Sequence, residues 1–383
     1  MKNSIEKSPI VKQKMHRYSG KRVLLIVPNL TRKGGVANYY NVILPKLRGE
    51  IDILQFGKDD EKKHRNRRLI SFLREFWAFC QLLLNKKYDI VHLNPSFDVK
   101  SIIRDSFYII TAKFMGAKVL IFFQGWHSDF EKRLKKFGFF LFRWIYNKTD
   151  AFIVLSTQYM YKLREWGFKQ IIFIETTVVD EELLKQFSVE EKILDYKRSK
   201  TKNILFLSRI VRKKGILIAI NAVKLVATEK KNVALYICGT GNDLPVVIDA
   251  SEKYKFIKYM GHVEGGKKRE ILTKSHIFIF PTLYDEGMPT VVIEAMAFGM
   301  PVLTRNVRGI ADLLEKGMQG FVTESTNPRV FAEFIKIILE DHDLYTRMAK
   351  KNYEIATRYF LAGDAAQRLL RIYDEVCQDD GRK

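Results

Sequence analysis

The sequence predicts an α/β protein made of two Rossmann-like domains, each with a parallel sheet, that face each other across a cleft. Short apolar, β-branched runs alternate with helical patterns, and this alternation occurs in two series separated by a charged segment at residues 181–201. The 383 residues are enough for two domains. Because 47% of them are hydrophobic and 28% charged, the chain can form packed cores and wholesale disorder is excluded.

The first series follows a polar, basic stretch at residues 1–20, which we expect to be a solvated tail. Residues 23–27 form an apolar run typical of a buried parallel strand, followed by the pair Gly34–Gly35 and a helical pattern from residue 36. Further strands are expected at residues 51–56, 88–93, 118–123 and 151–155, with a long amphipathic helix at 69–84. Together these elements form an N-terminal domain of residues 21–185.

The second series forms a C-terminal domain of residues 200–355. Its strands are expected at residues 203–207, 233–237, 256–259, 276–280, 301–304 and 320–323, with helices between most of them. The chain is helical and polar from about residue 344. Residues 356–383 are expected to form a separate final helix.

The segment of residues 276–304, HIFIFPTLYDEGMPTVVIEAMAFGMPVLT, is the most informative part of the chain. Its strand ends at Pro281, and Pro289 suits the first turn of a helix that stops at Gly299. The main chain of Gly287, Met288, Pro289 and Thr290 is therefore expected at a helix N-terminus. There the unpaired N–H groups, which all of these residues except proline have, and the helix dipole favour a phosphate.

Two carboxylates accompany this phosphate site: Glu286 just before the helix and Glu294 within it. A ligand with both phosphates and hydroxyls explains the combination, since a carboxylate accepts hydrogen bonds from a sugar diol. Such a ligand is a nucleotide sugar. The competing interpretation of Glu286 is an acidic first turn that complements the helix dipole. Glu294 lies among apolar neighbours, so it is expected to be partly buried and to need a partner.

Cations follow the predicted strand at 203–207, at Arg209 and in the run from Arg212 to Lys214. A strand-end position lets them reach the same edge, where they would stabilise the charge of a departing nucleoside diphosphate. The alternative is an exposed basic turn, which is common in a chain with 66 lysine and arginine residues.

These motifs resemble the signature of glycosyltransferase family 4, whose members have the GT-B fold. The resemblance covers most of residues 21–360 and includes Gly34–Gly35, LSRIVRKKG, ICGTGN, MGHVEG and the Glu-x7-Glu pattern in the order the family shows. It implies sugar transfer from a nucleotide-activated donor with retention of configuration, without a metal ion or other cofactor. It also implies that the final helix crosses back onto the N-terminal domain.

The resemblance assigns a role to each matching residue. Arg209 and Lys214 would bind the diphosphate, Glu286 the donor sugar and Glu294 the ribose. The main chain at Gly287, Met288, Pro289 and Thr290 would hold sugar and phosphate, His262 and Val263 would lie against the nucleobase, and Gly34 and Gly35 would let the backbone approach the diphosphate.

The sequence departs from the family pattern at one position. Family members often place a His-Gly pair after a strand of the N-terminal domain, but here the segment is FFQGWHSD, with Gln124 in the histidine's place. His127, three residues further on, is the candidate to replace it, although a locally bonded loop histidine is an equal alternative. Asp341-His342-Asp343 resembles a metal motif, but we interpret it as an acidic helix N-terminus. No metal site is expected.

The net charge of +23 is concentrated in the first half, where residues 1–200 carry 38 basic and 21 acidic residues. On a helical wheel of residues 130–148, Lys132, Lys135, Lys136 and Arg143 share one face, with Phe139, Phe140 and Phe142 on or beside it. The opposite face, which would be core, carries Phe130, Leu134, Phe137, Leu141 and Ile145. Such a face suits an anionic membrane surface, and the basic cluster at residues 62–68 could extend it. The alternative is a core helix with a solvated basic face.

The sequence therefore predicts a glycosyltransferase at the inner face of the cell membrane, acting on a glycan or lipid-linked saccharide acceptor in cell-surface polysaccharide or lipopolysaccharide synthesis. No apolar run is long enough to span a membrane, no signal peptide is visible, and three distant cysteines fit a reducing cytoplasm. The alternatives are a nucleotide-sugar epimerase, a transferase-like protein that binds without reacting, and a basic nucleic-acid- or membrane-binding protein. No nucleic-acid recognition motif is present. The donor base, uracil or guanine, is not specified.

Overall fold

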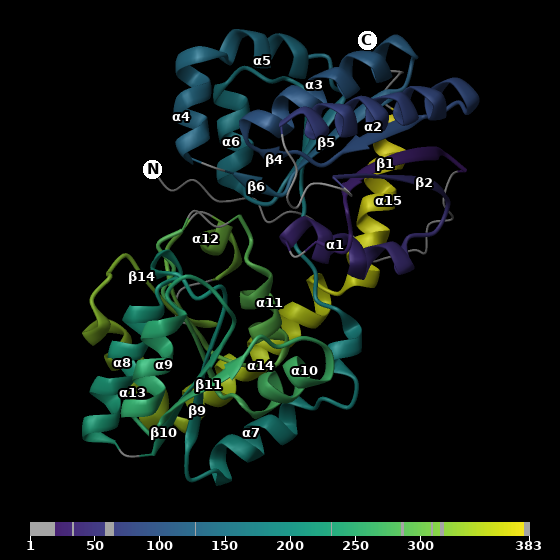
Figure 1. Ribbon diagram of the computed structural model, residues 1–383. Helices are drawn as coiled ribbons and strands as arrows, with labels where there is room; N and C mark the ends of the chain where they lie inside the picture. The colour runs from purple at the N-terminus through teal and green to yellow at the C-terminus, as the bar shows by residue number, and fades with distance from the viewer. Residues whose placement is uncertain are drawn as a thin grey trace, which may run out of the picture.

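A computed structural model describes residues 20–32, 34–57, 65–126, 128–230, 232–284, 287–307, 309–314 and 318–378. The protein has two α/β domains, one above the other in Figure 1, and each contains a six-stranded parallel sheet. The predicted fold class is therefore confirmed. The solvated tail expected at residues 1–20 lies outside the described residues, apart from Gly20.

The N-terminal sheet has the strand order β2-β1-β3-β5-β7-β8. The strands are β1 Arg22–Pro28, β2 Glu50–Phe56, β3 Ile90–Leu93, β5 Lys118–Phe123, β7 Ala151–Val154 and β8 Ile171–Ile174, and a small separate pair is formed by β4 Ser96–Phe97 and β6 Gly125–Trp126. Five of the six strands were predicted to within two residues at each end. The sixth, β8, was missed, although its sequence IIFI is apolar throughout.

Helices cover both faces of this sheet. Val23, Leu25 and Val27 pack with α1 and α15, whereas Leu24 and Ile26 pack on the opposite side with α2 to α6. The helices are α1 Gly35–Ile43, α2 Arg65–Asn85, α3 Val99–Phe114, α4 Ser128–Phe137, α5 Phe139–Tyr146 and α6 Thr157–Glu165, with a short 3-10 turn, η1 Leu44–Lys46. Successive side chains of β1 point to opposite faces of the sheet. Because helices cover both faces, the strand is apolar on both.

The C-terminal sheet has the strand order β11-β10-β9-β12-β13-β14. Its strands are β9 Lys202–Leu207, β10 Val233–Cys238, β11 Ile257–Gly261, β12 Ile277–Phe280, β13 Val302–Arg305 and β14 Gly320–Thr323, all of which were predicted. The helices and 3-10 turns are η2 Glu181–Leu184, α7 Val189–Arg198, η3 Arg212–Lys214, α8 Ile216–Glu229, α9 Leu244–Lys253, α10 Gly265–Lys274, α11 Thr290–Ala297, α12 Gly309–Leu313, α13 Pro328–Glu340, α14 His342–Tyr359 and α15 Ala362–Gln378. The charged segment at 181–201, expected to separate the domains, contains η2 and α7, and α7 buries Ile193 and Tyr196 in the C-terminal core.

Strand order locates the edge at which each sheet can bind a ligand. In open parallel sheets ligands bind beyond the carboxyl ends of the strands, where the order reverses direction. That point lies between β1 and β3 in the N-terminal sheet and between β9 and β12 in the C-terminal sheet. The predicted motifs at Gly34–Gly35, at residues 207–215 and at residues 281–294 follow β1, β9 and β12.

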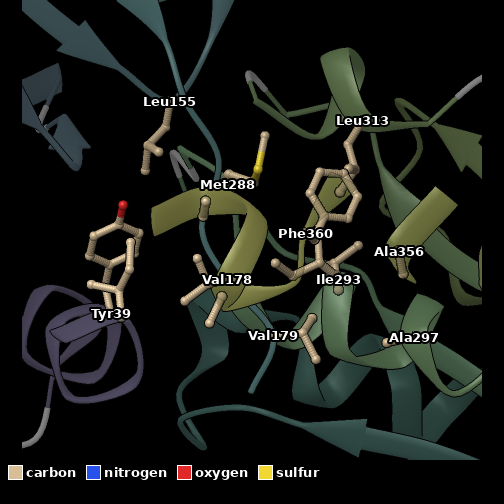
Figure 2. Packing of buried hydrophobic residues seen from close by; sticks show 14 of the residues in the cluster. Tyr39, Leu155, Val178, Val179, Met288, Ile293, Ala297, Leu313, Ala356 and Phe360 are labelled. Carbon is tan, nitrogen blue, oxygen red and sulfur yellow. The ribbon is translucent and has the colours of Figure 1, made fainter. Parts of the chain in front are cut away.

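The chain crosses between the domains twice, and the two crossings are hydrogen-bonded to each other. Val179 N–H donates to Phe360 O (2.7 Å), and Ala362 N–H donates to Val179 O (3.1 Å). The final helix α15 then packs on the N-terminal domain, where Tyr373 Oη lies 2.8 Å from His92 Nδ1 and Lys118 donates to Val376 O (2.7 Å). One hydrophobic cluster runs through both domains (Figure 2), from Tyr39 and Leu155 through Val178 to Met288.

The single helix assumed for residues 130–148 is wrong. The helix breaks at Gly138 into α4 and α5, so one wheel cannot describe the segment. Phe142, assigned to the basic face, is buried, and Leu141, assigned to the core, is exposed. Phe139 is half-buried with its ring against Trp166, whereas Phe140 is 84% exposed.

Candidate functional site

The loops after β9 and β12 are bonded to each other, which brings together two sequence clusters about 70 residues apart. Gly215 has a φ of 81°, and a Cβ there would lie 2.2 Å from Pro281 O. Leu283 N–H donates to Lys213 O (2.8 Å). Only glycine allows both the left-handed backbone and this close approach. The last glycine of the predicted motif therefore fixes the basic turn against the end of β12.

Arg209 and Lys214 converge on the ring of Tyr284. The Arg209 guanidinium carbon lies 5.7 Å and Lys214 Nζ 4.9 Å from the ring centroid. Arg209 is exposed, but Lys214 is buried, with 7% of its surface accessible. A buried lysine is costly without compensating interactions, and the electron-rich ring face offers one. The expectation that the two cations lie near the β12 loop is confirmed; Tyr284 was not singled out from the sequence.

Gly239 and Gly241 support the arginine loop from the neighbouring strand. A Cβ at Gly239 would lie 1.9 Å from Ser208 O, and one at Gly241 would lie 2.2 Å from Ile210 O. Ser208 N–H and Ile210 N–H donate to Cys238 O (3.1 Å) and Thr240 O (2.8 Å). This glycine pair, a weak motif by itself, therefore positions Arg209 by close backbone packing.

The main chain from Gly287 to Thr290 forms the start of α11. The helix begins at Thr290 with Pro289 as its N-cap, so the expectation of Pro289 in the first turn is off by one residue. No side chain caps this end, and no acidic residue lies in the first turn. Val292 N–H donates to Pro289 O (3.0 Å), but the N–H groups that precede it at the helix start have no carbonyl partner one turn back, so this end remains suited to an anion.

Two contacts hold this segment in place. A Cβ at Gly309 would lie 1.4 Å from Gly287 O, so only glycine fits beside it. On the other side, Gly287 faces the N-terminal domain, and a Cβ there would lie 3.4 Å from Gln124 O and 3.6 Å from the Leu155 side chain. The segment therefore lies at the interface where the strand ends of the two sheets meet.

Glu294 points into the domain as expected, and its partner is Lys268 of α10. Glu294 is 5% exposed, and its Oε1 lies 2.5 Å from Lys268 Nζ. Its other oxygen, Oε2, is buried and has no hydrogen-bond partner. A buried carboxylate oxygen left unsatisfied is costly, which suits an acceptor meant for a ligand hydroxyl. The sequence gives no signal for Lys268, which lies in the run GGKKRE.

The N-terminal domain contributes a second uncapped helix start. Gly34 is the N-cap of α1, which begins at Gly35, and no side chain caps it. A Cβ on either glycine would meet no atom within 4 Å. Nearby strand ends hold a buried amide: Asn94 accepts from Tyr40 Oη (2.7 Å) and from Gln124 Nε2 (3.5 Å). Burial raises the pKa of Tyr40, so the phenol stays a neutral donor.

Two predicted catalytic residues, Glu286 and His127, lie outside the described residues. The nucleobase candidates follow β11: His262 is exposed and its Nε2 lies 2.6 Å from Glu264 Oε1, whereas Val263 is buried. Asp341 is the N-cap of α14 and accepts from Leu344 N–H (2.7 Å), as expected for an acidic helix N-terminus. Within the described parts of the chain, no cluster of three metal-binding side chains occurs.

One polar contact links the two domains beside this interface. Asp312 of α12 accepts hydrogen bonds from Thr157 N–H (2.7 Å) and Thr157 Oγ1 (2.6 Å) at the start of α6. A carboxylate at a helix N-terminus is favoured by the dipole and by the unpaired N–H groups. The contact holds α12 and α6 together across the interface.

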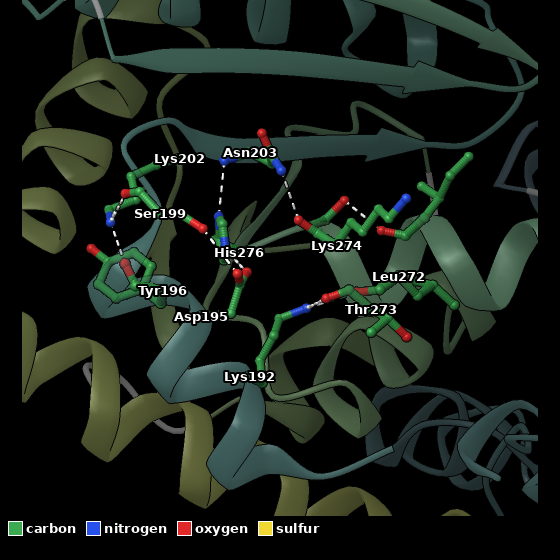
Figure 3. A network of polar contacts seen from close by, with 12 residues as sticks. Lys192, Asp195, Tyr196, Ser199, Lys202, Asn203, Leu272, Thr273, Lys274 and His276 are labelled. Atoms are coloured by element: carbon green, nitrogen blue, oxygen red, sulfur yellow. Dashed lines mark hydrogen bonds and ion pairs between the residues drawn. The ribbon is translucent and has the colours of Figure 1, made fainter. Parts of the chain in front are cut away.

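A separate polar network lies at the opposite edge of the C-terminal sheet, around the starts of β9 and β12 (Figure 3). Burial lowers the pKa of Lys192 to about 7 and that of His276 to about 4. His276 Nδ1 accepts from Asn203 N–H (3.0 Å), which leaves Nε2–H to donate to Asp195 (2.8 Å). This network fixes α7 to the sheet and is remote from the strand ends.

Two parallel-sheet domains meet at their strand ends, as in the GT-B fold. An uncapped helix start lies at each point of strand-order reversal, and Arg209 and Lys214 lie at the C-terminal one. Residues 190–355 match the family described as "Glycosyl transferases group 1". The C-terminal domain is therefore similar to the group 1 glycosyltransferases, and the family 4 resemblance is confirmed.

Named relatives agree with this assignment. The capsular polysaccharide biosynthesis glycosyltransferase CapM of Staphylococcus aureus is 30% identical over 168 residues, 42% of this chain and 43% of that protein. The N,N'-diacetylbacillosaminyl-diphospho-undecaprenol alpha-1,3-N-acetylgalactosaminyltransferase of Campylobacter jejuni is 31% identical over 110 residues, 29% of each chain. The match therefore spans less than half the length of either relative.

Solved structures share the fold over nearly the whole chain. The crystal structure of Anabaena Alr3699/HepE in complex with UDP and glucose has a TM-score of 0.69 at 14% identity, and the match covers 93% of this chain and 100% of that chain. At this identity the likeness establishes the GT-B fold.

Among the described residues, no helix combines the length and the apolar content needed to cross a membrane.

Proposed function

We propose that this protein is a retaining glycosyltransferase that transfers a sugar from a UDP- or GDP-linked donor to a glycan or lipid-linked saccharide. The convergence of Arg209 and Lys214 on Tyr284, at the point where the C-terminal strand order reverses, carries the proposal. Cations at this position would neutralise a diphosphate leaving group without a metal ion. The uncapped starts of α1 and α11 offer further donors to the same phosphates.

The remaining predicted residues take the roles that the family resemblance gives them. Glu294 would accept hydrogen bonds from the ribose through the unpaired Oε2, and His262 and Val263 would lie against the base. Glu286 would contact the donor sugar, and His127 or Gln124 would orient the reacting group. The names of relatives in capsule and lipid-linked oligosaccharide synthesis support an acceptor on a cell-surface glycan pathway.

We further propose that the protein works at the inner face of the cell membrane. The basic N-terminal half supports this location, since an undecaprenyl-type acceptor is held in a bilayer. Lys132, Lys135, Lys136 and Arg143 are exposed, as is Phe140, but half-buried Phe139 packs on Trp166. A lipopolysaccharide-type or capsule-type acceptor would then reach the N-terminal domain from the membrane.

Thermal unfolding with UDP, GDP and ADP, each with a chelator, tests the donor site. A nucleotide at about 100 times its dissociation constant would stabilise the fold by roughly 2.7 kcal/mol, a rise of several degrees in Tm. Arg209→Gln should reduce that shift, whereas Arg212→Gln is the matched control because Arg212 pairs with Asp243 instead. No shift with any nucleotide would remove the main support for the proposal.

Transfer itself is tested with Glu286→Ala. This variant should abolish sugar transfer while keeping most of the nucleotide-induced shift, because its side chain is assigned to the sugar and not to the diphosphate. Transfer at a rate near that of the unmodified protein would overturn the assignment. Nucleotide binding without an acceptor-dependent product would favour an epimerase.

A further inference from the structure

Three neighbouring helices of the N-terminal domain carry apolar side chains on their solvent side. On α3 the exposed residues Ile103, Phe107, Ile110 and Phe114 follow a spacing of three and four, and Phe114 is 88% exposed. This spacing makes one stripe along the helix. The stripe is continued on both flanking helices by Ile70, Leu73, Trp77 and Leu84 of α2 and by Phe140, Leu141 and Trp144 of α5. We call these eleven residues the apolar face.

The apolar face is one surface because its helices touch. Phe107 of α3 lies 5.8 Å, ring to ring, from Phe72 of α2, and α3 also contacts α5. All three helices lie in the layer on the far side of the N-terminal domain from the C-terminal domain (Figure 1). The same helices bury Phe79, Tyr108 and Phe142 against the sheet. Each of them is therefore apolar on two sides, although folding needs only one.

An exposed patch of this kind marks a binding surface. In the C-terminal domain, by contrast, exposed apolar side chains such as Leu194, Leu225, Ile248 and Ile337 are scattered over different helices, with 36–47% of their surface accessible. Scattered single residues are normal on soluble proteins. The continuous stripes on α2, α3 and α5 are not.

The charge around the apolar face selects its partner. Residues 65–148 contain 16 basic and 6 acidic residues. Most of the acidic side chains bond within the fold: Glu75 accepts from Gly57 N–H, Asp98 caps α3, Asp105 binds Arg104, Glu131 binds Lys162 and Trp126, and Asp89 accepts from Arg22 N–H. Cations of these helices instead lie exposed, including Lys100 of α3 and Arg143 of α5, and Lys132 is exposed on α4, which contacts α5. Lys148 lies over the exposed ring of Trp144, 4.5 Å from its centroid.

We propose that the apolar face is the surface by which this protein docks on an anionic lipid bilayer. A bilayer offers acyl chains to the stripes and anionic headgroups to the surrounding cations. A second copy would bring two strongly positive surfaces together, and a nucleic acid would leave the aliphatic stripes in water. The proposal rests on the proposed function in one respect: that function explains why the protein would bind a membrane. The choice of surface rests on the exposed side chains and the charge around them. It moves the contact from the single basic helix expected from the sequence to three helices.

Flotation with vesicles tests the proposal. The full chain should bind vesicles of phosphatidylcholine with about 30 mol% phosphatidylglycerol, and binding should weaken in high salt. The double variant Phe114→Ser/Phe140→Ser should lower the partition coefficient about tenfold or more, because it removes the two most exposed rings. Leu194→Ser/Ile337→Ser, on the C-terminal domain, is the matched control and should bind like the unmodified protein. Equal loss in both double variants would overturn the proposal.

The four tryptophans report the orientation directly. Trp77 and Trp144 lie on the apolar face, whereas Trp126 and Trp166 are buried. Bromine-labelled lipids should quench the fluorescence of the bound protein, and Trp77→Phe/Trp144→Phe should remove most of that quenching. Binding without quenching would place the contact elsewhere and contradict the proposal.

Two further outcomes would also reject a bilayer partner: no binding to anionic vesicles, or a concentration-dependent dimer in light scattering that Phe114→Ser/Phe140→Ser makes monomeric. The nucleotide-induced thermal shift is measured separately on the same variants. It should survive in Phe114→Ser/Phe140→Ser, so failure of the lipid surface and failure of the donor site can be distinguished.

Discussion

The two domains have sheets of the same size but use their surfaces differently. In the C-terminal domain, Gly215, Gly239, Gly241 and Gly309 each let one strand-end loop touch the backbone of another. In the N-terminal domain, Gly34 and Gly35 face open space, and the conspicuous feature is instead the apolar face on the outer helices. The family match covers only residues 190–355. The proposed donor site depends on close backbone contacts, which require glycine at fixed positions and so leave a sequence signature. The proposed docking surface requires only that apolar and basic side chains be exposed.

The largest difference should appear when glycines of the two domains are replaced. Gly239 has a φ of 135°, and its Cβ would lie 1.9 Å from Ser208 O. Gly239→Ala should therefore lower the free energy of unfolding by about 3 kcal/mol or more. Gly34→Ala, with an extended backbone and no atom within 4 Å of the new Cβ, should change it by less than about 0.5 kcal/mol. Urea unfolding measures both, and similar losses would mean that the close packing is not specific to the C-terminal domain.

Each sheet also buries one histidine, and both should make stability depend on pH. Burial lowers the pKa of His276 to about 4 and that of His92 to about 3. The unfolded chain takes up a proton near pH 6.5 and the folded chain does not, so the free energy of unfolding falls as the pH drops from 6.5 toward 4. His276 alone accounts for about 3 kcal/mol of this loss. A hydrogen bond also opposes protonation of His276, because its Nδ1 accepts from Asn203 N–H and would lose that bond on taking up a proton.

His276→Gln should flatten the pH dependence between pH 6.5 and 4, as measured by urea unfolding at a series of pH values. His92→Gln should act similarly in the other sheet, where His92 Nδ1 faces Tyr373 of α15. A slope unchanged in the double variant would show that other groups control acid stability.

Buried ion pairs give a third comparison. In α3, Asp105 is bonded by Arg104 through both carboxylate oxygens (2.5 and 2.9 Å), whereas Lys268 bonds only one oxygen of Glu294. We expect Lys268→Met and Arg104→Met each to cost about 2 kcal/mol or more, since each leaves a buried carboxylate without its partner. Only Lys268→Met should also weaken the thermal shift by nucleotide. A loss of that shift in Arg104→Met would contradict the distinction.

The sequence predicted most of the C-terminal site because its parts are local. Strand, turn and helix signals lie within a few residues of one another, so the positions of Arg209, Lys214 and Glu294 followed from pattern alone. Lys268 and Tyr284 did not follow, because their roles come from contacts between separate loops. Strand β8 was missed because four apolar residues carry little periodicity. The α4–α5 break was missed because Gly138 sits in an otherwise continuous helical pattern.

The smallest effect concerns the contact between the domains. Asp312 accepts two hydrogen bonds from Thr157 at the start of α6, but Asp312 is exposed and Thr157 is only half-buried. Asp312→Asn keeps the shape of the side chain and removes its charge. It should therefore weaken the contact between the domains by about 1 kcal/mol and leave the free energy of unfolding of each domain almost unchanged. Since Gly287 packs beside Gln124 at the same interface, opening it should raise the donor KM by less than about tenfold. Thr157→Val, which keeps the N–H donor, should have about half this effect, and an unchanged KM in both variants would show that the contact does not affect donor binding.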